Sequence, residues 1–456
     1  MAKSMPIVQR VRSYVKRGVD RLRNLRGGKD KGTQVQEAKS TVKTAETKVD
    51  ASKGQETVPS AGILTRPLHS RAVNSQIALM QKSVAATSAS SLNIALVNRT
   101  TSSQVYVYIV GLALNNNNAW FLLQSDGSTP YYPTSPSSTI QPLQANVAIQ
   151  LGAPGSTRTV TIPQLAGARI FVSIGSPLTF YLNPGPALVE PSVTNPSDPN
   201  FNIQWDFAEF TFNGGLYANI TYVDFVSIPI SLQLQNTSGA TQTVTGMPAN
   251  GLDTICANLQ AQSNSDGVAG WKNLVVTANG KNLRALSPNS DLALRPGDFA
   301  NYFEPYVEQV WQKYTTSTLT VKTPDNSINT SGMVTSGNLT LGSTSFTKPS
   351  TADIFSCSTG PFATGSDATR NVLIPQLAAA FNRTTLLKDT TTPAPLADFY
   401  QNSVTNHYAR IVHAANVDGK GYAFPYDDVN PAEGTDQSGF VSDPNPQLLT
   451  VTFGGW

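Results

Sequence analysis

Short apolar runs, many of them alternating with polar residues, fill the chain from about residue 91 onward. β-Branched and aromatic side chains make up most of each run, and Gly, Pro and Asn separate one run from the next. Runs at this density with turn residues between them indicate a β-sandwich or barrel. We expect strands at residues 92–97, 105–114, 157–162, 169–174, 178–182, 203–212 and 217–234.

A helical pattern enters between about residues 246 and 415. Apolar side chains recur there at spacings of three and four, with Asp298 as a candidate N-cap and Asn279-Gly280 as a hairpin signal. This order predicts a β domain of residues 90–245 plus 416–456, with an α/β domain of residues 246–415 inserted before its last strand. A cleft between the two is the expected ligand site. We expect helices at 252–259, 298–314, 372–381 and 396–414, and a terminal strand at 448–453.

The N-terminal region differs in both pattern and charge. Val and Leu recur at helical spacing over residues 5–26 among Arg and Lys, which predicts a basic amphipathic helix. Residues 1–60 as a whole are expected to form a disordered basic tail and linker. The helix could contact a membrane surface, act as a mitochondrial-type presequence, or be a solvated tail. It lacks the apolar stretch of a secretory signal, so we leave the localisation undecided.

Net charge separates the tail from the rest of the chain. Residues 1–54 hold 14 Lys and Arg against 5 Asp and Glu, whereas the remainder holds 18 against 24. The remainder is mildly acidic, so we expect no nucleic-acid partner. The longest apolar run, 105–114, is too short for a membrane helix, which needs about 20 residues, so no transmembrane segment is expected. Cys256 and Cys357 are the only cysteines, and we expect them to lie close enough to pair.

Several kinds of catalytic site lack their residues. His69, His407 and His413 have no acidic or cysteine cluster beside them, so we interpret them as structural and expect no metal. There is no G-x-S-x-G elbow, and the glycines with P-loop spacing precede Ser366 where a Lys is required. Carboxylates, amides, hydroxyls and aromatic rings remain, and these are the groups that act on sugars without a cofactor.

Two isolated acids stand out in the segment 201–226. Glu209 and Asp224 lie in apolar runs on either side of Gly214-Gly215. A two-residue hairpin loop would place Glu209 opposite Ile220 and Asp224 on the same face, with Cα atoms roughly 14 Å apart. Carboxyls within ~10 Å suit an inverting glycosidase better than a retaining one. A three-residue loop would put the two acids on opposite faces.

Polar and aromatic neighbours share the face of Glu209. Strand alternation places Trp205, Thr211 and Asn213 beside it, where the indole could stack on a sugar and the hydroxyl and amide could bind sugar hydroxyls. Equally, Trp205 could be core and the acids solvated. Asp427-Asp428 could be a second acidic cluster, although turn residues are the favoured interpretation.

Several motifs give the chain a family resemblance. The segments 205–226, 406–413, 418–428, 436–439 and 443–455 resemble glycoside hydrolase family 64, in matching order. The resemblance implies a thaumatin-like fold, a β-sandwich or barrel plus a mixed α/β domain around a broad groove. It also implies inverting cleavage of internal linkages in β-1,3-glucan, with Glu209 as general acid and Asp224 as general base. Thr211, Asn213 and Thr221 would line the groove.

The same resemblance bears on the localisation, cofactors and partners of the protein. Members are secreted and need no cofactor, and we expect β-1,3-glucan as the partner of a monomer. The missing secretory signal departs from the family pattern. Two alternatives remain: a non-catalytic glucan-binding or wall-associated structural protein, and a viral coat protein, whose basic arm and β sandwich this chain also has.

Overall fold

The computed structural model describes residues 89–323 and 329–455. The chain divides into two units, Met1–Thr65 and Arg66–Trp456, and every described residue belongs to the second. The expected tail and its amphipathic helix at 5–26 lie outside the described residues. Among the helices that the structure describes, none is long and apolar enough to cross a membrane.

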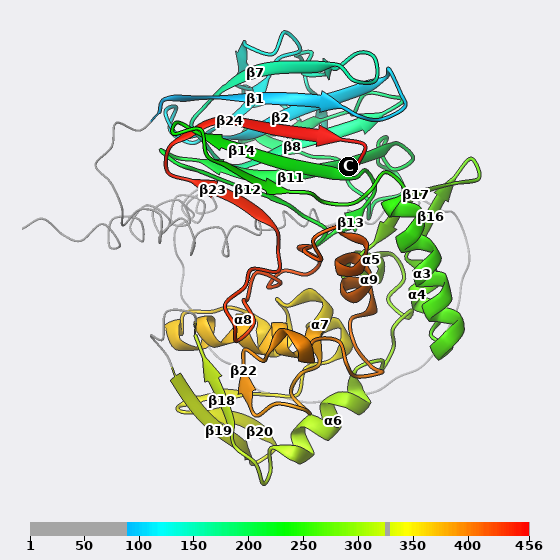
Figure 1. Ribbon diagram of the computed structural model, residues 1–456, viewed down its shortest axis with the longest axis vertical. Helices are drawn as coiled ribbons and strands as arrows, with labels where there is room; N and C mark the ends of the chain where they lie inside the picture. The colour runs from blue at the N-terminus through cyan, green and yellow to red at the C-terminus, as the bar shows by residue number, and fades with distance from the viewer. Residues whose placement is uncertain (1–88, 324–328, 456) are drawn as a thin grey trace, which may run out of the picture. The chain divides into compact units, whose positions relative to one another are not determined.

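Two sheets dominate the β region (Figure 1). In one, called the β14 sheet, the strand order is β15-β14-β24-β1-β7, so the C-terminal strand β24 lies between two strands that are distant in sequence. It pairs in parallel with β1 and antiparallel with β14. The strands of the β14 sheet are β1 (Ser91–Asn98), β7 (Thr157–Pro163), β14 (Ile230–Asn236), β15 (Thr241–Val244) and β24 (Pro446–Phe453).

The second, called the β11 sheet, carries the candidate acid Glu209. Its strand order is β23-β12-β11-β8-β2-β3-β4, and β6 also pairs with β2. The strands are β2 (Val105–Ala113), β3 (Ala119–Leu123), β4 (Pro130–Tyr131), β6 (Ile149–Gln150), β8 (Leu165–Ile174), β11 (Gln204–Phe212), β12 (Leu216–Ile220) and β23 (Phe440–Asp443).

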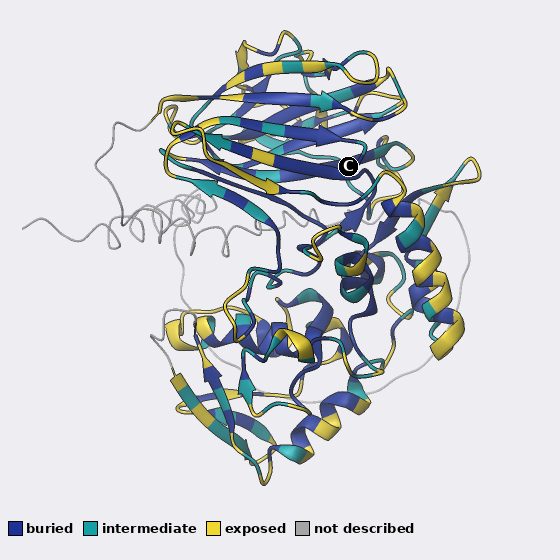
Figure 2. Cartoon of the chain, in the orientation of Figure 1, coloured by how far each residue is buried: buried dark blue, intermediate teal, exposed yellow. Residues whose placement is uncertain are grey.

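One hydrophobic core joins the two sheets. Because side chains alternate along a strand, Ala208, Phe210 and Phe212 of β11 point to one face, where they share a cluster with Ile94 and Val451 of the β14 sheet. Both sheets contribute fully buried side chains to this cluster, and Figure 2 shows the buried strands. The expected mainly β fold is confirmed.

The remaining elements are three small sheets and the helices of the described residues. The strand orders are β10-β9-β5, β13-β17-β16 and β21-β20-β19-β18-β22. Their strands are β5 (Gln141–Pro142), β9 (Tyr181–Asn183), β10 (Ala187–Val189), β13 (Phe225–Val226), β16 (Val275–Ala278), β17 (Lys281–Leu286), β18 (Leu319–Lys322), β19 (Asn329–Thr335), β20 (Asn338–Leu341), β21 (Thr344–Phe346) and β22 (Thr391–Thr392). The helices are α3 (Gly251–Asp266), α4 (Ala269–Asn273), α5 (Pro288–Leu294), α6 (Glu304–Lys313), α7 (Thr351–Ser356), α8 (Ala368–Arg383) and α9 (His407–Ala415), with 3₁₀ turns η1 (Gly360–Phe362) and η2 (Leu396–Asp398).

Local signals were right about some elements and wrong about others. The Asn279-Gly280 hairpin is confirmed, since Ala278 pairs with Lys281. Asp298 is not an N-cap: α6 begins at Glu304, and the Asp298 carboxylate instead accepts hydrogen bonds from Asn273 and Arg295. The expected helix at 396–414 is shorter, because α9 begins only at His407.

The hairpin between β11 and β12 corrects the expected register. Phe212 pairs with Leu216 and Glu209 with Asn219, so the loop has three residues, not two. Phe212 and Leu216 are both fully buried in the main core, and a register that pairs them keeps both there. Gly214 supplies the positive φ of 81° that the loop needs.

The two cysteines do not pair. Cys256 and Cys357 are both buried and free, which makes the expected bridge wrong. The Cys357 thiol donates to the Ile354 carbonyl oxygen and accepts from the Asn382 amide, both at 3.3 Å. Burial raises the pKa of Cys256 to about 12, so its thiol stays protonated at neutral pH.

Candidate active site

The outer face of β11, away from the main core, changes from apolar to polar along the strand. Trp205 and Phe207 belong to a second hydrophobic cluster, whereas Glu209 and then Thr211 follow on the same face. The Glu209 side chain is 18% exposed. Glu209 therefore stands where the second cluster ends and solvent begins.

Arg169 is the residue that holds Glu209. It lies opposite Glu209 on the neighbouring strand β8. Its Nε and Nη2 each lie 3.3 Å from Oε1 of Glu209, and its Nη1 donates to Oε2 of Glu190. The guanidinium carbon lies 4.7 Å from the centre of the Phe207 ring. One cation thus joins two carboxylates at the edge of the apolar cluster.

Asp224 reaches the site by a route that strand alternation does not describe. Strand β12 ends at Ile220, and the chain then crosses to β13 in a different sheet. Two hydrogen bonds fix the crossing at Tyr222: its N–H donates to the Tyr422 carbonyl at 2.7 Å, and its carbonyl accepts from the Tyr408 hydroxyl at 2.6 Å. The Asp224 carbonyl accepts from the Ser287 N–H at 2.9 Å.

Glu209 and Asp224 both lie in the electrostatic field of Arg169. Burial alone would lower the pKa of Arg169, but Glu190, Glu209 and Asp224, in decreasing order, raise it above its ordinary value. The three-residue loop, by strand alternation alone, would have put Asp224 on the face opposite Glu209. The crossing after Ile220 breaks that alternation, which is why Asp224 still interacts with Arg169.

A buried carboxylate fixes the far end of the crossing. Asp206 is 1% exposed, and its Oδ2 accepts from the N–H groups of Ser227 at 2.7 Å and Ile228 at 3.0 Å. Burial raises the pKa of Asp206 to about 7, against these hydrogen bonds and the charge of Arg284. Strand β11, which carries Glu209, is thus bonded to the segment just after Asp224.

The structure corrects the expected role of Trp205. The side chain is 2% exposed, its ring meets Phe225 edge-on at 4.7 Å, and its Nε1 donates to the Asn200 carbonyl. The indole is part of the second cluster, with no face open to a sugar, so the stacking role is wrong. The alternative that Trp205 is core was the correct one.

The other expected binding residues differ in exposure. Thr211 is buried, and its Oγ1 accepts from the Gly167 N–H at 3.3 Å. Thr221 is also buried, and its Oγ1 accepts from the Val223 N–H at 3.4 Å. Asn213 is exposed in the hairpin loop. Asn213 is therefore the freest of the three to meet a ligand.

Sequence reasoning missed several residues around Glu209. Asn219, its partner across β12, is 2% exposed, and its Nδ2 has no hydrogen-bond partner among the described residues. Tyr217 shares that face and stacks on Phe440, with ring centres 5.1 Å apart. The register would have identified both, but the two-residue loop assumed from the sequence placed them on the opposite face.

A segment near the C-terminus adds another acid. Burial, followed by the charge of Asp427, raises the pKa of Asp428 to about 7. Burial raises the pKa of Tyr217 and of Tyr422, and the charges of Asp428 and Glu209 raise both further. Asp428 therefore belongs to the electrostatic surroundings of the candidate site.

Asp427 is a turn residue, which confirms the favoured interpretation, although the turn is not exposed at this position. It is fully buried, with Oδ1 2.9 Å from Nη2 of Arg383 and Oδ2 2.9 Å from Nε2 of His413. Burial would raise the pKa of Asp427, but His413 and Arg383 lower it below the ordinary value. The pairing holds the segment that carries Asp428 and Tyr422.

No metal site is evident in the described ranges. Within residues 89–323 and 329–455, no group of three or more His, Cys, Asp and Glu is placed to hold an ion. His407 lies 3.0 Å from the Ser403 carbonyl and accepts from Arg410, and burial lowers its pKa to about 4. It is neutral and bonded within the fold at physiological pH.

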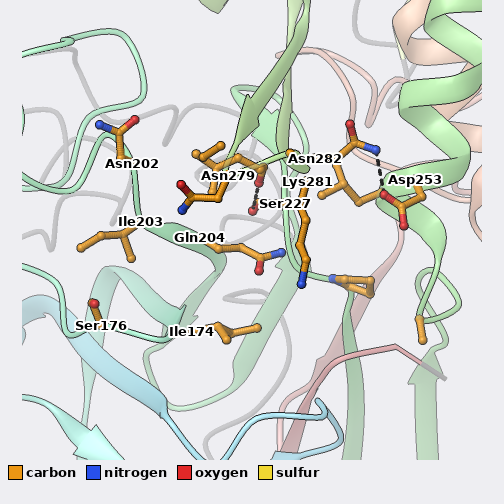
Figure 3. A pocket seen from close by; sticks show the side chains of 16 residues that line it. Ile174, Ser176, Asn202, Ile203, Gln204, Ser227, Asp253, Asn279, Lys281 and Asn282 are labelled. Carbon is orange, nitrogen blue, oxygen red and sulfur yellow. Dashed lines mark hydrogen bonds between the residues drawn. The ribbon is translucent and has the colours of Figure 1, made fainter.

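A hollow of about 860 Å³ opens at the other end of β11 (Figure 3). Gln204 of β11, Asp253 of α3 and Lys281 of β17 contribute to its lining, and Asn282 donates to Asp253. Neither Glu209 nor Asp224 belongs to the lining. The hollow is therefore separate from the candidate acids on β11 and on the crossing to β13.

Comparisons with known proteins agree on one family. Residues 90–453 match the model of family 64 of the glycoside hydrolases, described as beta-1,3-glucanase. Proteins from Cellulosimicrobium cellulans and Arthrobacter sp. (strain YCWD3), both named glucan endo-1,3-beta-glucosidase, are each 33% identical over 304 residues. These residues are 64% of this chain and 53% of each relative, so the chain spans about half the length of the curated relatives it matches.

A solved structure gives the same result. A laminaripentaose-producing beta-1,3-glucanase, crystallised in complex with laminaritetraose, superposes with a TM-score of 0.71 at 32% identity. The match covers 80% of this chain and 98% of that one.

Proposed function

We propose that this chain, which belongs to the β-1,3-glucanase family of glycoside hydrolases, family 64, cleaves internal β-1,3 linkages of β-1,3-glucan. The names of its relatives and the laminaritetraose bound by the similar structure support this substrate. The observation that supports the proposal is that Arg169 bonds to Glu209 while the charge of Asp224 also raises the pKa of Arg169, so both isolated acids lie in the field of one cation.

In the proposed mechanism the two acids act on opposite faces of the sugar. Glu209 donates a proton to the glycosidic oxygen, while Asp224 takes a proton from the water that attacks C1, so the anomeric configuration inverts. Oε1 of Glu209 faces Arg169, and Oε2 accepts no hydrogen bond from the described residues. Oε2 is therefore free to hold the transferred proton.

The residues proposed to line the substrate groove lie around Glu209. The hydroxyls of Thr211 and Thr221 and the amide of Asn213 are the proposed groove residues. Asn219 lies opposite Glu209 on β12, but its Nδ2 is buried, so we assign it a place behind the groove surface and no direct contact with the sugar. No cofactor takes part in these steps.

The domain organisation belongs to the proposal as well. A thaumatin-like β domain of residues 90–245 and 416–456 and an inserted α/β domain of residues 246–415 would border a broad groove. The placement of β24 between β14 and β1 supports a β domain that the last strand completes. The crossing at Asp224 supports contact with the inserted part, since β13 pairs with β17.

Product analysis on a linear β-1,3-glucan tests this function. Purified protein is incubated with curdlan, and a parallel sample receives a β-1,4-glucan as control. We expect β-1,3-linked oligosaccharides of intermediate length from the first and none from the second. Binding of curdlan without release of sugar would instead identify a non-catalytic glucan-binding protein.

A further inference from the structure

We propose that Glu190, acting through Arg169, sets the pH range in which Glu209 can act as a proton donor. The inference rests on the proposed function, because it concerns the group assigned as general acid. Glu190 directly follows β10, outside the β11 sheet, and nothing in the resemblance assigns it a role. It is a positioning residue, since it touches Arg169 and not the reacting atoms.

The geometry divides the charge of Arg169 unequally. Nη1 makes a close contact with Oε2 of Glu190, whereas Nε and Nη2 both reach a single oxygen of Glu209 at the longer distance of 3.3 Å. The side chains of Arg169, Glu190 and Glu209 are 15%, 20% and 18% exposed. The trio is mostly shielded from water, so its charges interact more strongly than at a free surface.

The sharing of Arg169 between Glu190 and Glu209 bears on how Glu209 donates its proton. A lone Arg169 would favour the ionised Glu209, which cannot donate a proton. Glu190 binds Nη1 of the same guanidinium and so compensates part of the positive charge that faces Glu209. When the proton leaves, the guanidinium can move closer to Glu209 and stabilise the new negative charge. With Glu190 present, Arg169 can lie beside Glu209 both before and after Glu209 loses its proton.

Other titratable groups surround the trio of Arg169, Glu190 and Glu209. Asp224, in the crossing segment, raises the pKa of Arg169 less than Glu190 or Glu209 does. From β12, Tyr217 faces the site with its pKa raised, and it remains neutral. The groups contributed by the segment before β23 are Tyr422, Asp428 and Asp436.

The test compares pH profiles of kcat/KM for wild type and Glu190→Gln. The basic limb of such a profile reports loss of the proton from the general acid. Removing one charge a few ångströms away in a partly shielded site should move this limb to lower pH by about one unit. The acid limb should move less, because Asp224 is the weakest of the three partners of Arg169.

Two variants serve as controls. Glu190→Asp keeps the charge and should restore the basic limb towards its wild-type position. Glu308→Gln removes one charge from an exposed side chain on α6 that pairs with Lys348, and it should leave the profile unchanged. A Glu190→Gln enzyme with altered kcat or KM but an unmoved basic limb would show that the pair is only structural and overturn the inference.

A second readout separates this inference from the proposed function. The side-chain carboxyl ¹³C signal of Glu209, assigned by its absence in Glu209→Gln, is titrated in wild type and in Glu190→Gln without substrate. A lower midpoint in Glu190→Gln is expected even if the protein fails to cleave glucan. In that case the coupling would stand and the glucanase assignment would fall, whereas identical midpoints would contradict the coupling.

Discussion

Asp206 connects the stability of the fold to the geometry of the candidate site. Its buried carboxylate bonds β11 to the segment just after Asp224, and burial raises its pKa to about 7 from the model-compound value of 3.8. The native state therefore holds a proton at this residue, between about pH 4 and 7, that the unfolded chain has released. The resulting stabilisation is complete below pH 3.8 and is lost as pH rises through about 7.

The size of this effect follows from the shift. One pKa unit corresponds to ~1.4 kcal/mol, so Asp206 should reduce the free energy of unfolding by about 2 to 3 kcal/mol between pH 5 and pH 8. Asp206→Asn imitates the protonated acid at every pH. We expect this variant to lack that part of the pH dependence, at a cost of ~1 kcal/mol for one backbone N–H that then faces the amide nitrogen.

Urea denaturation of wild type and Asp206→Asn at pH 5 and pH 8 measures the difference directly. Asp418→Asn, which neutralises an exposed carboxylate, is the control and should follow wild type at both pH values. Asp206→Ala removes the acceptor of three buried N–H groups, those of Phe207, Ser227 and Ile228, so it should destabilise by several kcal/mol and lower kcat by releasing the Asp224 segment. Equal pH dependence in wild type and Asp206→Asn would refute the reasoning.

Three further predictions concern the surroundings of the site. Trp205→Phe should lower the free energy of unfolding by about 1–3 kcal/mol while KM for glucan oligosaccharides stays within twofold, because the indole is core; a large rise in KM would return it to the substrate site. Asn219→Ala should leave KM within twofold and change the melting temperature little, since its buried Nδ2 has no partner to lose and does not reach the surface; a several-fold rise in KM would place Asn219 in contact with the substrate. His413→Gln should destabilise by ~1–3 kcal/mol below pH 6.5, because Asp427 raises the pKa of His413 and that stabilisation disappears as pH rises through the raised value. An equal loss at pH 6 and pH 9 would contradict the assigned His413–Asp427 charge pair.

The sequence predicted most of the long strands, because they bury alternating side chains in one core. The strand expected at 217–234 was wrong, since that run forms β12, β13 and β14 in three different sheets. Phe210 and Phe212 could be recognised from their period of two, and the Asn279-Gly280 turn from residues that accept a positive φ. The register of β11 with β12 could not be predicted from the sequence, because Gly214-Gly215 fits a two-residue and a three-residue loop equally well. Burial of Leu216 opposite Phe212 decides it.

The candidate site was only partly predictable for a related reason. Glu209 and Asp224 could be chosen as isolated acids in apolar surroundings. The route of Asp224 to the site depends on hydrogen bonds of Tyr222 with the Tyr422 carbonyl and the Tyr408 hydroxyl, which are distant in sequence. Trp205 could not be assigned to core or site from alternation alone, since Glu209 shares its face.

The first product released from a linear β-1,3-gluco-oligosaccharide tests the central claim most directly. ¹H NMR follows the anomeric signals during the first turnovers of wild type, with Glu209→Gln and Asp224→Asn in parallel. We expect the α-anomer to form first, and each variant to lose at least ~10²–10⁴-fold in kcat while it keeps the wild-type melting temperature. A β-anomer formed first, or wild-type turnover in either variant, would contradict the assignment of Glu209 and Asp224 as an inverting acid and base.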